Sequence, residues 1–231
     1  MVKPQKKLKE YFSLSMRKLR HRKGFGVHSP FAYSIITEVI EEKTPYYAYQ
    51  RMRRTYRDNR KAPVPLKVAY LLFRLANRFR AHEILEIESD GGYTLLPLVF
   101  QDSRNRIRSV ASDAMRAQFH RDFSWVGEKR QAQVTFTGSL AEFPEDYRPE
   151  MVVINDLPAG MSSSELWTWL EAHLPDNGIV WVRGIQPKQH LEELWDYICD
   201  CDGISVTMDL YSYGLAIRKP RFYKQHYTVS F

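Results

Sequence analysis

The sequence predicts an α/β protein in which a mostly parallel sheet follows a region made only of helices. Near residue 80, helical spacing of apolar residues gives way to short apolar runs that alternate with helical stretches. This alternation is typical of a parallel sheet covered by helices on both faces. At the end of the chain, apolar runs over 204–210 and 215–218 are joined by a short turn, which predicts a hairpin and one antiparallel strand. We therefore expect a basic helical N-terminal region over 1–80 and an α/β domain over 81–231.

The first 80 residues contain only helical patterns. Ser29 and Pro30 are typical of the cap and the first position of a helix. The stretch Pro63-Val64-Pro65 predicts a stiff connector before the last helix of the region. Together these signals predict four helices, over 4–22, 31–42, 46–60 and 66–79.

The remaining 151 residues alternate between strands and helices. The apolar runs predict strands over 83–87, 107–111, 133–136, 151–154 and 178–182. Between and after them we expect helices over 94–100, 114–126, 164–174 and 188–199. The closing hairpin then completes the sheet.

The charge is divided unevenly along the chain. The whole sequence carries +7, but residues 1–80 carry +15 and residues 81–231 carry −8. Basic clusters over 3–23 and 51–61 could neutralise the phosphates of a nucleic acid. Solvated helix faces are the favoured interpretation of such clusters, so nucleic-acid binding is kept only as an alternative.

Several classes of protein are excluded by what the sequence lacks. It has no apolar run of the roughly 20 residues needed to span a membrane, and no signal-peptide pattern, so we expect a cytoplasmic protein. Its two cysteines form neither a disulfide framework nor a zinc motif, and its histidines form no metal-binding pair. Phosphate-binding loops and nucleophile elbows are also missing, which argues against nucleoside triphosphatases and hydrolases. No metal is expected.

Several segments resemble a known family in the right order. Residues 24–31 read GFGVHSPF, 84–87 read ILEI, 209–214 read DLYSYG and 218–226 read RKPRFYKQH. These segments resemble a class I S-adenosylmethionine (SAM)-dependent methyltransferase-like family of Bacteroidetes. The resemblance implies a Rossmann-like sheet of seven strands with one antiparallel strand, and SAM as cofactor. It also implies methyl transfer to an acceptor that the sequence does not identify.

The loop after the first strand departs from the pattern of this family. The family has Glu-x-Gly-x-x-x-Gly, whose glycines let the backbone approach the methionine part of the cofactor. Here the loop reads EIESDGG: Glu86 and Gly92 match, but Glu88 stands at the first glycine and Asp90 at a small residue. The Glu88 carboxylate would occupy ligand space and repel the carboxylate of the cofactor. A shift of the loop onto Gly91 and Gly92 would avoid this conflict.

The other positions implied by the resemblance are also altered. Asp113 is the candidate partner of the cofactor ribose, with Ser112 in the expected slot, and Ser139 stands where an acid usually lies near the adenine. Asn155 or Asp156 would face the acceptor. The resemblance thus implies a cofactor site lined by Glu86, Glu88, Ser89, Asp90, Gly91, Gly92, Ser112, Asp113, Ser139, Asn155 and Asp156. It assigns no catalytic residue.

Two functions are compatible with these residues. The first is a SAM-dependent methyltransferase with an unknown acceptor. The second is a catalytically inactive protein of the same fold that acts as a binding or interaction module, with nucleic-acid contact through its basic N-terminal region as a further option. The residues that motivate the second function are Glu88, Asp90, Ser112 and, after the fifth strand, Arg183 in place of an acid.

Overall fold

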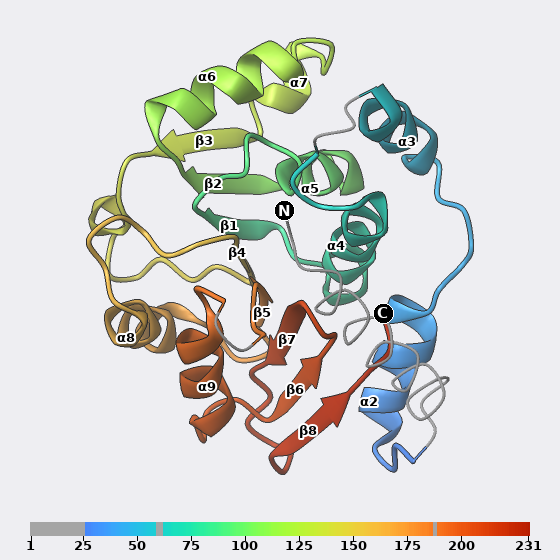
Figure 1. Ribbon diagram of the computed structural model, residues 1–231, viewed down its shortest axis with the longest axis vertical. Helices are drawn as coiled ribbons and strands as arrows, with labels where there is room; N and C mark the ends of the chain where they lie inside the picture. Colours follow the sequence, from blue (N-terminus) through green and yellow to red (C-terminus); the bar gives the residue numbers. More distant parts are fainter. Residues whose placement is uncertain (1–25, 59–61, 187–188) are drawn as a thin grey trace, which may run out of the picture.

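The computed structural model describes residues 26–58, 62–186 and 189–231, and these build a sheet of eight strands (Figure 1). The order is β3-β2-β1-β4-β5-β7-β6-β8. Strand β7 is antiparallel to both β5 and β6, and every other pairing is parallel. The strands are β1 (Glu83–Ile87), β2 (Arg106–Val110), β3 (Val134–Thr137), β4 (Met151–Ile154), β5 (Ile179–Arg183), β6 (Val206–Asp209), β7 (Tyr213–Ile217) and β8 (Gln225–Thr228). The predicted α/β class, with one antiparallel strand in a mostly parallel sheet, is confirmed.

The eighth strand was not predicted. Strand β8 pairs with β6 at the edge of the sheet, and its four residues, QHYT, alternate between half-buried and exposed. A short polar edge strand carries no apolar run, so hydrophobic patterning does not reveal it. The sheet therefore has one strand more than the seven that the resemblance implied.

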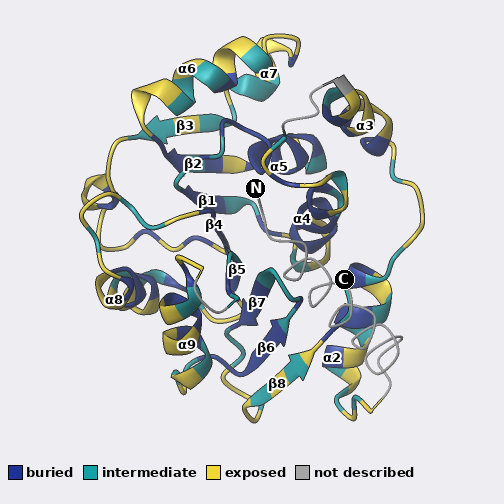
Figure 2. Ribbon diagram, in the orientation of Figure 1, coloured by how far each residue is buried: buried dark blue, intermediate teal, exposed yellow. Residues whose placement is uncertain are grey.

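Helices cover both faces of this sheet (Figures 1 and 2). Alternate residues of each central strand point to opposite faces: Ile84 joins one buried cluster, whereas Leu85 and Ile87 join the other. The cluster around Ile84 includes α2 (Pro30–Ile35), the π-helical turn η1 (Ile36–Ile40), α3 (Tyr49–Asp58), α4 (Leu66–Phe79), α5 (Leu95–Gln101) and α6 (Asp113–Asp122). The opposite cluster includes α8 (Ser163–His173) and α9 (Glu192–Asp200). Two short helices, α7 (Glu128–Gln131) and the 3₁₀ turn η2 (Leu140–Glu142), complete the structure.

The helix starts agree with the capping signals in the sequence. The Ser29 hydroxyl accepts a hydrogen bond from the Ala32 N–H at 3.3 Å, and Pro30 is the first helical residue, as predicted. Helix α4 has the predicted bounds, whereas α3 begins at Tyr49 rather than at residue 46. The helix predicted over 4–22 lies outside the described residues.

The described N-terminal helices share their core with the sheet. The buried Arg74 side chain of α4 donates hydrogen bonds to the Val39 and Ile40 carbonyls at the end of η1 and to the Tyr49 hydroxyl of α3. The Tyr49 and Tyr70 rings stack at 3.7 Å between centroids. Because one cluster contains buried side chains from α2 to β7, these helices are part of the same hydrophobic core as the α/β domain.

Candidate functional site

The loops after β1, β2, β3 and β4 begin at one edge of the sheet. Parallel strands that are neighbours present their carboxyl ends together, which is where open α/β sheets bind ligands. Backbone hydrogen bonds tie these loops to one another: the Ser89 N–H donates to the Val110 carbonyl, the Ala111 N–H to the Thr137 carbonyl and the Asn155 N–H to the Ile87 carbonyl. The structure thus brings the predicted loops to a common edge.

Glu86 lies at the centre of this edge and is fully buried. Its carboxylate accepts hydrogen bonds from the Ser109 hydroxyl at 2.6 Å, from the Thr94 hydroxyl and from the Asn155 amide at 3.3 Å. The Asn155 amide also donates to the Thr94 hydroxyl at 3.0 Å. Four side chains from β1, β2, the start of α5 and the end of β4 therefore form one buried polar network.

A second carboxylate joins the network. Asp90 Oδ1 accepts a hydrogen bond from the Thr94 N–H at 3.1 Å and lies 3.2 Å from the Thr94 hydroxyl oxygen, whose single proton is directed to Glu86. Burial, together with the charge of Asp90, raises the pKa of Glu86 to about 7. Burial also raises the pKa of Asp90, and the Thr94 hydrogen bonds and the charge of Arg183 act against that rise. Two acids in one buried site disfavour double ionisation, so the network keeps a proton to higher pH than exposed carboxyl groups do.

Two buried acceptor atoms beside Glu86, Asp90 Oδ2 and Asn155 Oδ1, have no hydrogen-bond partner among the described residues. A buried polar group without a partner costs about 1–3 kcal/mol, and a ligand that forms a hydrogen bond with it recovers that cost. Their position beside Glu86 makes this edge the candidate site.

Glu88 adopts the backbone conformation of a glycine. Its φ is +56°, in the left-handed region, and its side chain is half-buried. Burial, with the nearby Asp156 carboxylate, raises the pKa of Glu88. The loop therefore keeps a glycine-type turn at this position while carrying an acidic side chain.

Gly91 and Gly92 have φ values of +81° and +108° and pack against α6. A Cβ on Gly91 would lie 2.7 Å from the Gln118 amide, and one on Gly92 would lie 2.5 Å from the Phe119 ring and 2.6 Å from the Phe123 ring. Crowding against the two rings and the positive φ are enough to require glycine at position 92, and the positive φ favours glycine at position 91, where the Gln118 side chain can move. Close approach to a cofactor is not needed to explain these two residues.

Two of the predicted residues act as helix caps. The Ser112 hydroxyl accepts from the Met115 N–H at the start of α6, and the Ser139 hydroxyl accepts from the Ala141 N–H. Glu142, which sequence reasoning missed, accepts hydrogen bonds from the Gly138 and Ser139 N–H groups. In contrast, the Asp113 carboxylate is 99% exposed, with Arg116 4.0 Å away, and is open to a ligand.

Asp156 is exposed, and its carboxylate accepts from the Leu157 N–H at 2.9 Å. Its buried neighbour Asn155 lies in the Glu86 network. Asn155 and Asp156 were the alternatives for facing the acceptor, and the structure shows that Asn155 is buried whereas Asp156 is exposed.

Two further residues lie near Asp90: Arg183, which the sequence showed in place of an acid, and Tyr56, which had no signal in the sequence. Arg183 ends β5, and its guanidinium donates to the Pro63 carbonyl at 2.8 Å, which ties the connector before α4 to the sheet edge. Tyr56 of α3 is buried and donates to the Tyr93 carbonyl at 2.8 Å. Burial, with the Asp90 charge as a smaller contribution, raises the pKa of Tyr56, so its hydroxyl stays protonated. The N-terminal helical region thus contributes to the surroundings of the site.

Within the described ranges, no three His, Cys, Asp or Glu side chains are grouped closely enough to hold a metal ion. No helix among those residues is long and apolar enough to cross a membrane.

Comparisons with solved structures identify the fold. The O-methyltransferase TomG from Streptomyces achromogenes, solved in complex with SAM, is 16% identical over 76% of this chain and 91% of its own, with a TM-score of 0.55. An O-methyltransferase from Bacillus cereus in complex with SAH is 14% identical over 80% of this chain and 97% of its own, with a TM-score of 0.56. A putative caffeoyl-CoA O-methyltransferase from Staphylococcus aureus is 14% identical over 81% of this chain and 98% of its own, with a TM-score of 0.57.

These likenesses show that the chain has the Rossmann-like fold of the SAM-dependent methyltransferases. No protein-family model matches the sequence, and no curated protein is significantly similar to it.

Proposed function

We propose that this protein is a SAM-dependent methyltransferase that binds its cofactor at the carboxyl edge of β1, β2 and β4. The fold supports this, because structural neighbours of similar length are O-methyltransferases, one solved with SAM and another with SAH. The resemblance of the GFGVHSPF and DLYSYG segments to a methyltransferase-like family points the same way. The acceptor is unidentified.

The observation that carries the proposal is the set of buried, unpartnered polar atoms beside Glu86. Asp90 Oδ2 and Asn155 Oδ1 are acceptors, as the ammonium group of the cofactor requires. The exposed Asp113 carboxylate can accept from the ribose hydroxyls. These residues fit SAM in the chemistry of their donors and acceptors.

The bound cofactor would supply an electrophilic methyl group, so the protein mainly needs to position an acceptor and exclude water. Glu86, Thr94 and Asn155 hold one another in place and orient the unpartnered Asn155 oxygen. Tyr56 of α3 and Arg183, which is hydrogen-bonded to the connector before α4, lie near Asp90. Glu88 opposes binding of the cofactor carboxylate, and its raised pKa reduces that repulsion because the neutral form repels less.

The test is calorimetric titration of the purified protein with SAM and with SAH. We expect saturable binding of both, and an Asp113→Ala variant that binds about tenfold more weakly because it loses the ribose acceptor. Glu128→Ala is a matched control, since Glu128 is also an exposed acid in the first turn of a helix. Equal affinities of the wild type and Asp113→Ala would contradict the assignment of Asp113.

Absence of binding at millimolar SAM and SAH, in both the wild type and Glu88→Gly, would reject the cofactor site. The catalytically inactive interaction module would then be the function to pursue. No feature of the described residues favours that module over an enzyme, because the acidic loop residues that motivated it lie in a network that retains unpartnered acceptors.

A further inference from the structure

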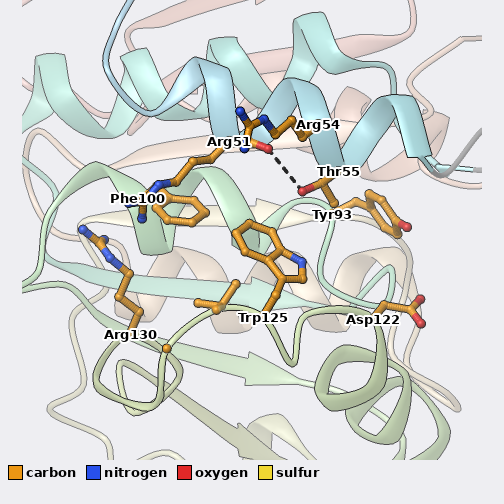
Figure 3. Close-up of a pocket in the computed structure, with 10 residues that line it drawn as sticks. Arg51, Arg54, Thr55, Tyr93, Phe100, Asp122, Trp125 and Arg130 are labelled. Atoms are coloured by element: carbon orange, nitrogen blue, oxygen red, sulfur yellow. Dashed lines mark hydrogen bonds between the residues drawn. The ribbon is translucent and has the colours of Figure 1, made fainter.

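A separate cavity of about 680 Å³ lies on the helical face of the sheet, between α3 on one side and the end of α6 and α7 on the other (Figure 3). It extends along α5 from Tyr93, which precedes the cap of that helix, to Phe100 near its end. The Glu86 network lies at the carboxyl edge of the sheet and contributes no residue to its lining. A cavity of this size holds a ligand of the dimensions of a single nucleotide.

One end of the cavity is cationic. The Arg51 and Arg130 guanidiniums both lie against the Phe100 ring, 5.7 Å and 5.0 Å from its centroid, although they come from different helices. Arg130 is held in place by a hydrogen bond of 2.7 Å to the Val99 carbonyl. Arg54 lies one turn after Arg51 on α3 and also lines the cavity.

These three guanidiniums have no carboxylate partner within the described part of the chain. Guanidiniums gathered without a carboxylate repel one another, and a phosphate group relieves that repulsion with charge-assisted, bidentate hydrogen bonds. This end of the cavity is therefore suited to an anion.

The middle of the cavity is aromatic. The Phe100 and Trp125 rings stack with centroids 5.8 Å apart and an interplanar angle of 21°. Phe100 is buried, but Trp125 is 47% exposed, and its indole is open to the cavity (Figure 3). An exposed indole next to guanidiniums is a platform on which a planar base can stack.

The other end of the cavity carries an acceptor. Asp122 lies at the opposite end from Arg51 and Arg130 (Figure 3), and its carboxylate is 3.5 Å from the Arg121 guanidinium. Its free acceptor positions can bind N–H or O–H donors but would repel a phosphate. The cavity therefore runs from cations through an aromatic platform to a hydrogen-bond acceptor.

We propose that this cavity binds a nucleoside diphosphate, with its phosphates on Arg51, Arg54 and Arg130 and its base on Trp125. In this arrangement, N–H or O–H groups of the base or the sugar donate hydrogen bonds to the Asp122 carboxylate. The site is distinct from the proposed cofactor site. A single nucleotide is favoured over a nucleic-acid strand because α3 and α7 border the cavity on both sides.

The proposal is tested by calorimetric titration with ADP, with pyrophosphate as the phosphate part alone and adenosine as the ring part alone. We expect ADP to bind more tightly than either part, with an affinity that falls as salt is raised. Arg51→Gln, Arg54→Gln and Trp125→Ala should each weaken ADP binding about tenfold, since each removes one charge-assisted contact or the stacking surface. Arg53→Gln is the matched control, because Arg53 is an exposed arginine of the same helix that does not line the cavity.

Each contrary outcome has a defined meaning. No saturable ADP binding at millimolar concentration, or an equal loss in Arg53→Gln, would overturn the site. Displacement of ADP by SAH would place the nucleotide in the cofactor site instead. If a ten-nucleotide oligoadenylate binds more tightly than ADP, and the same variants lose that binding, the ligand of the cavity is a nucleic-acid strand rather than a single nucleotide.

Arg54 forms no described hydrogen bond within the protein, so Arg54→Gln tests the site without removing a structural contact.

Discussion

At the scale of single residues, Glu88 combines a backbone that favours glycine with a charged side chain. A side chain at φ near +56° costs about 1 kcal/mol relative to glycine. Desolvation of the half-buried carboxyl adds to this cost when the group is ionised. Both effects make Glu88 unfavourable for stability at this position.

We predict that Glu88→Gly raises the free energy of unfolding by about 1 kcal/mol and also strengthens SAH binding. Urea denaturation and calorimetry measure the two effects. Arg80→Gly is the control, because Arg80 has φ of +52° at the end of α4. It should share the gain in stability without a change in SAH affinity. A loss of SAH affinity in Glu88→Gly would instead assign Glu88 a binding role.

At the scale of elements, the site loop is shaped by its contact with α6. Gly92 brings the loop against the Phe119 and Phe123 rings, and Gly91 brings it against Gln118. The position of the loop therefore depends on helix α6, whose first turn also carries the exposed Asp113. Packing of the loop after β1 against α6 thus sets the position of that loop relative to the Asp113 carboxylate.

Gly92→Ala should destabilise the protein by about 2–4 kcal/mol, because the added methyl group meets two buried rings and φ is positive. Gly160→Ala separates the two causes, since Gly160 has φ of +79° but no atom within 4 Å of the added carbon. It should cost only about 1 kcal/mol. Thermal and urea unfolding of both variants provide the comparison, and equal costs would show that crowding against α6 is unimportant.

At the scale of the whole molecule, the buried acids couple stability to pH. The pKa of Glu86 is about 7 in the folded state, against an ordinary value of 4.5. Because the folded state binds this proton more tightly than the unfolded state, the contribution of Glu86 to stability falls as pH rises from about 4.5 to about 7. Above about pH 7 this contribution to the free energy of unfolding is lost completely, and the total loss is at most about 3 kcal/mol.

Glu86→Gln removes this titration. We expect the free energy of unfolding of the wild type to fall between pH 4.5 and 7.5 relative to that of the variant, as measured by urea denaturation at each pH. Glu145→Gln, which alters an exposed acid, should follow the wild type. Parallel curves for the wild type and Glu86→Gln would show that Glu86 titrates normally in the folded protein.

The sequence by itself determined the order of the elements from α2 to β7, apart from the short α7 and η2. The bounds of α4, β1 and β4 agree with the prediction, as does the Ser29 cap, because periodicity and capping depend on residues that are neighbours in the chain. The loops that form the candidate site were predicted for the same reason, since each directly follows an apolar strand.

Only the tertiary structure decided which distant residues meet. Tyr56 and Arg183 lie near Asp90, and Arg51 and Arg130 share the Phe100 ring, although no local pattern links these positions. The structure also showed that Ser112 and Ser139 are caps and that β8 extends the sheet. Such contacts arise from packing between elements, whose geometry is set by the whole core rather than by any one segment.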